Sequence, residues 1–349
     1  MLVHASFRLN GNAYERNALD LAAQQWAVSS DEEQQALGYF LMDWLSDDEH
    51  IALHTSGSTG KPKEIQMPKT AMYASAVRTA AFFNLSEVDS ALLCLPIRYI
   101  AGKMMLVRAL VLGLHLDIIP PKTKLPIEKD YTFAALIPLQ ANASFDVLGR
   151  FKTVLIGGAP IPTDLRKRIS KKYKHCIETY GMTETLTHVA TRIVSDAVIP
   201  FRAMPGIGIS TDENDCLVLE VPYVPLSPIV TQDVVRREGD DTFSLLGRRD
   251  WVINSGGMKI FPEALEEVLT PFIKFPFFFT ALPDANLGEK LVLLAEAPTT
   301  EKAAIMAIAQ QHMGDNKHHV PKQVICLNDF VRTYSGKLNR KATIKGLNM

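Results

Sequence analysis

The sequence is most informative at residues 55–63, which read Thr55-Ser56-Gly57-Ser58-Thr59-Gly60-Lys61-Pro62-Lys63. Glycines let a backbone turn so that its amide N–H groups converge on an anion, while hydroxyls and lysines add donors and positive charge. We therefore expect this loop to bind phosphate. It departs from the Walker A pattern, which needs a glycine in place of Thr55 and a hydroxyl in place of Pro62. A polar turn between two strands is the alternative, although such turns need only about two to five residues.

The composition is that of an ordinary globular protein. Apolar residues make up 47% and charged residues 21% of the 349, and the formal net charge is −1. This length allows two domains and a large core. The balanced charge argues against a nucleic-acid partner, which would need a basic surface. The longest apolar stretch, residues 104–116, contains Arg108 and is too short to cross a membrane.

Cysteine usage and the N-terminal residues both favour a cytoplasmic location. Cys94, Cys176, Cys216 and Cys326 lie far apart, without the spacing of metal ligands or of a redox pair. The first residues have no basic region followed by an apolar stretch, so they do not read as a secretory signal. We therefore expect a cytoplasmic protein with no nucleic-acid and no membrane partner.

Apolar runs of strand length alternate with helical periods through the first two thirds of the chain. Two helices are expected first, at 13–28 and 31–46. Strands are then expected at 91–96, 116–119, 133–138, 153–156 and 176–180, and helices near 69–84, 101–114 and 163–172. Such alternation predicts an α/β fold with parallel strands. The basic residues between 166 and 172 read as the solvated face of one helix.

The pattern changes twice toward the C-terminus. From 205 to 247 the helical periods vanish, and short strands predict a β-rich subdomain. After Gly247 strands at 251–254, 258–261, 277–282, 291–296 and 323–327 are mixed with helices starting at Pro262 and spanning 300–313. We therefore expect a large N-terminal α/β domain at residues 1–247, with its β-rich subdomain. A small mobile α+β domain at 248–349 would follow it.

Two segments lie at the ends of predicted strands. Gly157-Gly158-Ala159 follows the strand at 153–156, where small residues let a flat ligand approach the backbone, although a plain tight turn fits equally well. Tyr180-Gly181-Met182-Thr183-Glu184-Thr185 follows the strand at 176–180. A carboxylate beside hydroxyls suits Mg²⁺ bridged to phosphate, while a helix cap is the alternative.

Two further segments are ambiguous alone. Residues 247–251 form a charged corner, and 254–259 contain a glycine turn that a simple hairpin would explain. Residues 332–340 are a basic stretch near the C-terminus, and most such tails are solvent-exposed.

Together and in this order, these segments resemble the adenylate-forming superfamily of acyl-CoA synthetases, peptide-synthetase adenylation domains and luciferases. The resemblance covers about residues 50–341. Residues 55–63 match its phosphate loop, 180–184 its Tyr-Gly-x-Thr-Glu motif and 247–250 its Gly-Arg-x-Asp hinge motif. Ser335-Gly336-Lys337 matches its C-terminal lysine motif.

The resemblance implies a role for each matching residue. In the phosphate loop, the β- and γ-phosphates of ATP would be held by Thr55, Ser56, Gly57, Ser58, Thr59, Gly60 and Lys63. The adenine and acyl pocket would be lined by Gly157, Gly158, Ala159, Tyr180 and Gly181, with the Tyr180 ring on adenine. Thr183 would touch the α-phosphate and Glu184 would bind Mg²⁺. Asp233 would hold the ribose hydroxyls, although Gln232 replaces the glycine usual before it, and Arg248 would support ribose or phosphate.

The resemblance also implies a two-step reaction with coenzyme A as co-substrate. Lys337 would be catalytic in forming an acyl-adenylate. The C-terminal domain would then rotate about Asp250, which brings Gly256, Gly257 and Lys259 beside the thiol channel. One site would thereby serve two transition states.

Within the superfamily, the compact chain with its motifs at residues 99–103, 180–188 and 253–257 is similar to short o-succinylbenzoate–CoA ligases of menaquinone biosynthesis. That acid carries two carboxylates, so a cation near the acyl pocket is expected. The candidates around this pocket are Arg98, Tyr99, Lys103, His188 and Arg202, where Tyr99 replaces a histidine common in relatives. Two alternatives stay open: an enzyme that passes an acyl group to a carrier-protein thiol, and a non-catalytic binding relative.

Overall fold

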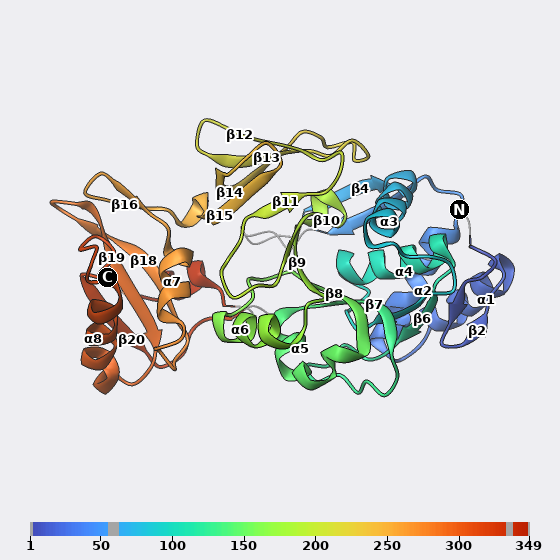
Figure 1. Cartoon of the computed structure of the whole chain (residues 1–349), viewed down its shortest axis with the longest axis horizontal. Helices are drawn as coiled ribbons and strands as arrows, with labels where there is room; N and C mark the ends of the chain where they lie inside the picture. The colour runs from blue at the N-terminus through green and yellow to red at the C-terminus, as the bar shows by residue number, and fades with distance from the viewer. Residues whose placement is uncertain (1–2, 55–62, 333–337, 348–349) are drawn as a thin grey trace. The chain divides into compact units, whose positions relative to one another are not determined.

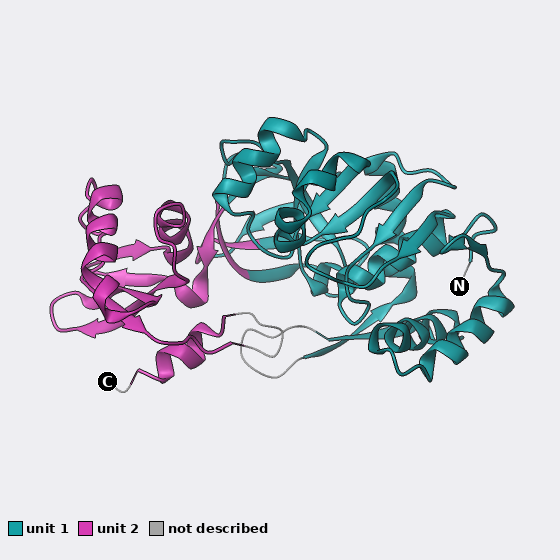
Figure 2. Cartoon of the chain, turned by 90° about the horizontal axis from the view of Figure 1, so that it is seen from below, with its two compact units in different colours: residues 1–212, 218–231, 237–244 teal, residues 213–217, 232–236, 245–349 magenta. Residues whose placement is uncertain are grey.

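The computed structural model describes residues 3–54, 63–332 and 338–347. The chain divides into two compact units (Figure 2). The N-terminal unit comprises residues 1–212, 218–231 and 237–244, and the C-terminal unit comprises 213–217, 232–236 and 245–349. The predicted division into an N-terminal domain at 1–247 and a mobile C-terminal domain at 248–349 stays a prediction. No helix in the described residues is long and apolar enough to span a bilayer.

Five parallel strands form the middle of the main sheet (Figure 1). They are β5 (Ser90–Leu93), β6 (His115–Ile118), β7 (Tyr131–Leu136), β8 (Phe151–Ile156) and β9 (Cys176–Gly181), in the order β9-β8-β7-β5-β6. Their carboxyl ends therefore meet at one edge of the sheet. The predicted α/β fold with parallel strands is confirmed.

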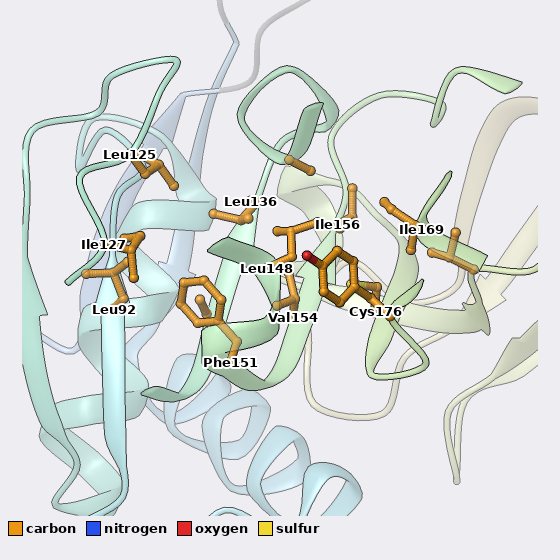
Figure 3. Close-up of a cluster of buried hydrophobic side chains, with 14 of the residues drawn as sticks. Leu92, Leu125, Ile127, Leu136, Leu148, Phe151, Val154, Ile156, Ile169 and Cys176 are labelled. Carbon is orange, nitrogen blue, oxygen red and sulfur yellow. The ribbon is translucent and has the colours of Figure 1, made fainter. Parts of the chain in front are cut away.

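One helix precedes the first of these strands, the others follow β5, β7 and β8 in sequence, and both faces of β8 are buried. The helices are α3 (Lys69–Phe83), α4 (Ile100–Leu112), α5 (Pro138–Ala143) and α6 (Thr163–Lys172), with a 3₁₀ turn η1 (Phe145–Arg150). Figure 3 shows one core, in which Val154 and Ile156 of β8 lie with Ile169 of α6. Leu155, on the opposite face of β8, is 3% exposed. Burial of both faces explains why these strands read as continuous apolar runs.

One part of the prediction for α6 is wrong. Arg166 was expected on a solvated face, but its side chain is 2% exposed and donates a hydrogen bond to Glu178 of β9 at 2.6 Å. Leu165 and Ile169, its neighbours on the helix, are in the same buried core. Arg166 therefore lies on the face of α6 that packs against the sheet.

Antiparallel strands extend the sheet beyond β9. β10 (His188–Ile193) pairs with β9, β11 (Phe201–Ala203) with β10, and β15 (Thr242–Arg248) with β11. The order continues through β14 (Ile229–Arg237), β13 (Cys216–Glu220) and β12 (Gly208–Thr211). At the other edge lie β1 (Arg8–Leu9) and β2 (Asn12–Ala13). The β-rich character expected for residues 205–247 is confirmed.

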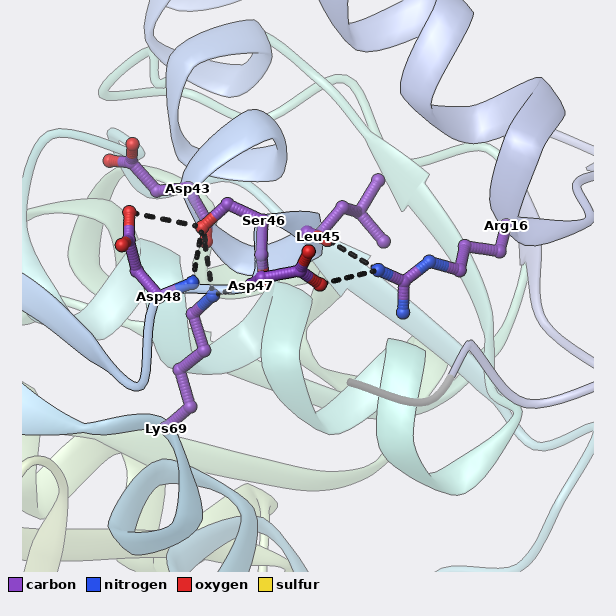
Figure 4. A network of polar contacts seen from close by, with 7 residues as sticks. All are labelled: Arg16, Asp43, Leu45, Ser46, Asp47, Asp48 and Lys69. Carbon is purple, nitrogen blue, oxygen red and sulfur yellow. Dashed lines mark hydrogen bonds and ion pairs between the residues drawn. The ribbon is translucent and has the colours of Figure 1, made fainter.

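A helical hairpin precedes a separate two-stranded sheet. The hairpin is α1 (Arg16–Ala27) and α2 (Glu32–Leu45), and the sheet is β3 (His50–His54) with β4 (Glu64–Pro68). A polar network fixes the chain where α2 ends and β3 is about to begin (Figure 4). Lys69, 2% exposed, donates from Nζ to the carbonyl and hydroxyl oxygens of Ser46 at 2.9 and 3.1 Å.

The C-terminal unit is an α+β arrangement of its own. A mixed sheet has the order β17-β16-β19-β18, with β20 paired in parallel to β19. The elements are β16 (Ile253–Ser255), β17 (Met258–Ile260), α7 (Pro262–Leu269), β18 (Phe277–Asp284), β19 (Gly288–Glu296), α8 (Lys302–Met313), β20 (Gln323–Leu327) and α9 (Arg340–Lys345). The strand expected from 251 instead begins at Ile253, because residues Arg249–Trp251 form a 3₁₀ turn, η3.

Candidate active site

The predicted phosphate loop connects β3 to β4. The two strands are paired as far as His54 and Glu64, so the chain leaves and re-enters this sheet at neighbouring positions. Of the loop residues, Lys63 is described and exposed. The other predicted phosphate ligands lie outside the described residues: Thr55, Ser56, Gly57, Ser58, Thr59 and Gly60. Their roles stay predictions.

The glycines at the ends of β8 and β9 permit close backbone approach. A Cβ on Gly157 would lie 2.4 Å from Oγ1 of Thr179, and one on Gly181 would lie 2.3 Å from the carbonyl oxygen of Thr187. Gly158 has a φ of +80°, which side chains disfavour, and Ala159 beside it is exposed. Because β8 and β9 are parallel neighbours, the structure brings 157–159 and 181–185 to the same sheet edge.

The motif after β9 turns sharply and is strained. Thr183–Thr185 form a 3₁₀ turn, η2, in which Oγ1 of Thr185 accepts from the Met182 amide at 3.0 Å. Leu186, fully buried, follows with φ 65° and ψ −41°, a conformation that costs energy for a side chain with a Cβ. The turn leaves Thr183 and Glu184 half-buried at the sheet edge.

Tyr180 packs beside aromatic side chains of β11 and β15. Its ring centroid lies 5.9 Å from that of Phe201 and 5.5 Å from that of Phe243. The ring is half-buried. These neighbours fix its orientation at the sheet edge, as a residue that stacks on a base would require.

Arg108 on α4 lies beside the residues that follow this turn. Its guanidinium, 3% exposed, donates a hydrogen bond to the hydroxyl of Thr187, and its Nε has no hydrogen-bond partner among the described residues. Oγ1 of Thr187 is 3.0 Å from Nδ1 of His188, and Nε2 of His188 is 3.5 Å from Oγ1 of Thr79. We call Thr79, Arg108, Thr187 and His188 the arginine cluster.

Burial dominates the electrostatics of the arginine cluster. It lowers the pKa of Arg108 to about 10, so the guanidinium stays charged at neutral pH. Burial, and then the charge of Arg108, hold the pKa of His188 well below its usual value, so His188 is neutral. Sequence reasoning proposed His188 but missed Arg108, although this charge interrupts an otherwise apolar helix.

The other predicted cations have different neighbours. Lys103 lies with its Nζ 5.4 Å from the Phe40 ring centroid. It is five positions from Arg108, or roughly 140° around α4, so the two side chains leave different faces. Arg98 lies over the exposed ring of Tyr99, and the exposed Arg202 pairs with Asp241 at 2.6 Å. Among the predicted acid-binding candidates Arg98, Lys103, His188 and Arg202, His188 belongs to the arginine cluster, whereas the three cations have the other neighbours given above.

Three predicted residues of the C-terminal unit lie close together. Arg248 Nη1 is 3.4 Å from Oδ1 of Asp233, and Arg248 Nη2 is 4.0 Å from Oδ2 of Asp250. The Asp233 side chain is 13% exposed. The structure thus places the predicted ribose ligand beside the predicted hinge residue.

The glycine turn at Gly256 and Gly257 joins β16 to β17. Both residues have positive φ, +59° and +81°, as the tightest hairpin turns require, so the simple hairpin interpretation describes the local structure. Lys259, exposed on β17, pairs opposite Asn254. Lys337 lies outside the described residues.

The described residues contain no group of three or more His, Cys, Asp or Glu that could hold a metal ion. Mg²⁺ usually takes only one or two protein carboxylates and completes its shell with phosphate oxygens and water. Glu184, half-buried at the sheet edge, offers one such carboxylate.

Comparison with known sequences defines the class. A family described as AMP-binding enzyme matches residues 13–228, and the chain belongs to this family. An acyl-CoA synthetase (AMP-forming)/AMP-acid ligase II-like protein from Dyadobacter fermentans is 31% identical and superimposes with a TM-score of 0.59. That comparison covers 94% of this chain and 98% of the relative.

More specific relatives share one named activity. The 2-succinylbenzoate–CoA ligase of Bacillus cytotoxicus is 25% identical over 83% of this chain and 68% of its own length. O-succinylbenzoate CoA synthetase from Bacillus subtilis, solved with the acyl-adenylate OSB-AMP, superimposes with a TM-score of 0.70 at 20% identity. The superposition covers 83% of this chain and 68% of the Bacillus subtilis chain. The fold is that of the adenylate-forming enzymes.

Proposed function

We propose that this protein is an ATP- and Mg²⁺-dependent, AMP-forming acid–CoA ligase whose acid is o-succinylbenzoate. The observation that carries the choice of acid is the arginine cluster. Arg108 is a buried cation whose described hydrogen bond is to a neutral hydroxyl. A buried charge is costly until an opposite charge pairs with it, and the second carboxylate of this acid would supply that charge.

The nucleotide would lie along the edge where β8 and β9 end. Residues 157–159 and Tyr180 would contact adenine, Thr183 the α-phosphate and Asp233 the ribose, while residues 55–63 would hold the other phosphates. Glu184 would hold Mg²⁺, which shields the charge of the departing pyrophosphate when bound. The fixed orientation of the Tyr180 ring supports this placement.

The reaction would proceed in two steps. The reacting carboxylate of the acid attacks the α-phosphorus and displaces pyrophosphate, and the thiol of coenzyme A then attacks the acyl carbon and displaces AMP. The first step brings two anions together, so Lys337 would neutralise and align them. Rotation of residues 248–349 about Asp250 would then bring Gly256, Gly257 and Lys259 to the thiol. The enzyme would act in the cytoplasm.

Pyrophosphate release tests this proposal. We expect release with o-succinylbenzoate and ATP, and AMP with the CoA thioester once coenzyme A is added. A benzoate lacking the succinyl carboxylate should be a much poorer substrate. Release with the monocarboxylate alone would overturn the choice of acid, and turnover only with a carrier protein would overturn the choice of thiol.

A further inference from the structure

The segment that carries Lys337 is flanked by two arginines, and a carboxylate of the C-terminal unit holds each. Arg332 donates two hydrogen bonds to Glu296 at the end of β19, one of them from Nη1 to Oε1 at 2.7 Å. Arg340 donates to Glu266 of α7, from Nη1 to Oε1 at 2.9 Å and from Nη2 to Oε2 at 2.6 Å. Paired bonds between guanidinium and carboxylate are strong and fix orientation.

Each carboxylate is itself fixed by a backbone amide. Glu296 accepts from the Phe330 amide at 2.7 Å, and Glu266 accepts from the Phe279 amide at 2.9 Å. The two carboxylate side chains are 13% and 14% exposed. The hydrogen bonds from Arg332 and Phe330 lower the pKa of Glu296 to about 2, so this carboxylate is ionised at neutral pH.

The two flanks also bond to each other. Arg332 and Leu338 form an antiparallel bridge, and the Asn339 amide donates to the carbonyl oxygen of Val331 at 2.8 Å. The Asn339 side chain then caps α9 by accepting from the Ala342 amide. The chain therefore enters and leaves residues 333–337 at adjacent, anchored points.

We propose that Glu266 and Glu296 are positioning residues for the acid-activating step. They hold the two ends of the segment that carries Lys337 through Arg340 and Arg332. This inference rests on the proposed function, in which Lys337 acts in adenylate formation and leaves before the thiol reacts. Loss of either carboxylate should therefore slow the first step and spare the second.

The test separates the two half-reactions in Glu266→Gln and Glu296→Gln. Acid-dependent exchange of pyrophosphate into ATP should fall about 10- to 100-fold, because a small misplacement of a reacting group costs this much. The KM for ATP and the rate of thioester formation from supplied acyl-adenylate should stay near wild type. Asp130→Asn, in the exposed Arg150–Asp130 pair, is the matched control and should change neither step.

Trypsin cleavage after Arg332 and Arg340 gives a readout that does not need activity. In native protein, cleavage follows the population in which these arginines are released from their carboxylates. We expect it to be about fivefold faster in both Gln variants than in wild type, and Glu296→Asp to restore part of the protection. Unchanged cleavage, or an equal loss of both half-reactions, would overturn the inference. If wild-type protein shows no acid-dependent pyrophosphate exchange, the proposed function is overturned. The cleavage comparison would then still test whether Glu266 and Glu296 hold the segment.

Discussion

Two arginines are almost completely buried in the N-terminal unit, and they differ in what balances their charge. Arg166 donates to Glu178 at 2.6 Å, and Arg192 donates to the same carboxylate at 2.7 and 3.0 Å. Arg108 donates to the hydroxyl of Thr187, and no described residue forms an ion pair with it. In the first site one carboxylate is shared by two guanidinium groups, whereas in the second no described carboxylate pairs with the guanidinium.

We propose that this difference separates a structural arginine from one that binds the acid. A buried pair holds two elements together, here α6 and β9, and breaking it is costly because a charge is left alone. A buried cation that faces only neutral groups has already lost its hydration without gaining a counter-charge. A bound anion would recover that energy, so Arg108 should govern substrate affinity and Glu178 should govern stability.

Glu178→Gln should have the largest effect, and it should be on stability. The change leaves Arg166 and Arg192 buried without a carboxylate, so the free energy of unfolding should fall by about 3–5 kcal/mol. Urea denaturation measures this, and KM for the acid in folded protein should not move. Asp164→Asn, which removes an exposed pair on the same helix, should cost less than about 0.5 kcal/mol. A large change in acid selectivity in Glu178→Gln would contradict a purely structural role for the Arg166–Glu178 pair.

Arg108→Met should act on affinity and leave stability intact. Methionine fills similar space without charge, and loss of a charge-assisted hydrogen bond worth about 1.5–3 kcal/mol should raise KM for o-succinylbenzoate about 10- to 150-fold. Steady-state kinetics should show KM for ATP unchanged, and thermal denaturation should show no loss of stability. The idea fails if KM for a monocarboxylate analogue rises by the same factor.

Sequence patterns anticipated the sheet better than the charges inside it. The parallel strands are buried on both faces, so they appear as apolar runs that any reader of the sequence can find. Glu178 and Arg166 sit on neighbouring elements, and nothing in the pattern of α6 tells that Arg166 turns inward. Arg108 was visible as a break in an apolar stretch, but its contact with Thr187 depends on the tertiary fold.

The failure at Trp251 has a different cause. Local composition favoured a strand from 251, whereas the chain makes a 3₁₀ turn there and begins β16 at Ile253. Tertiary context overrides such short-range preference readily. The strand β10 was not anticipated, because its mixed sequence includes Arg192, whose charge is balanced by Glu178 on β9.

The pH dependence of stability should reveal the charge left at Arg108. His188 has a folded pKa held below its usual value of 6.5, so above that value it is neutral in both states. Below pH 6.5 the unfolded chain binds the proton first, and the free energy of unfolding should fall by up to about 1.4 kcal/mol per pH unit. The fall should continue until the folded pKa is reached.

Denaturation between pH 7 and pH 5 measures this contribution in wild type, His188→Gln and Arg108→Met. The His188→Gln difference from wild type should shrink as pH falls, since the glutamine does not titrate. Arg108→Met should narrow the pH window, because the arginine charge is the second cause of the low pKa. Identical slopes in all three proteins would show that His188 is not held neutral by its surroundings.

Lys103→Gln should have the smallest effect, which makes it the sharpest control for Arg108. Both cations lie on α4, but Lys103 reaches the Phe40 ring of α2, and the nearby Asp43 carboxylate partly offsets the effect of burial on its pKa. Like Arg166, which pairs with Glu178, Lys103 already has a carboxylate neighbour, so it gains little from a second one. KM for o-succinylbenzoate should therefore change less than about twofold, within the range of ordinary surface substitutions. If Lys103→Gln instead matched Arg108→Met in kinetics, the second carboxylate would bind on the α2 side of α4, and the missing counter-charge at Arg108 would need another occupant.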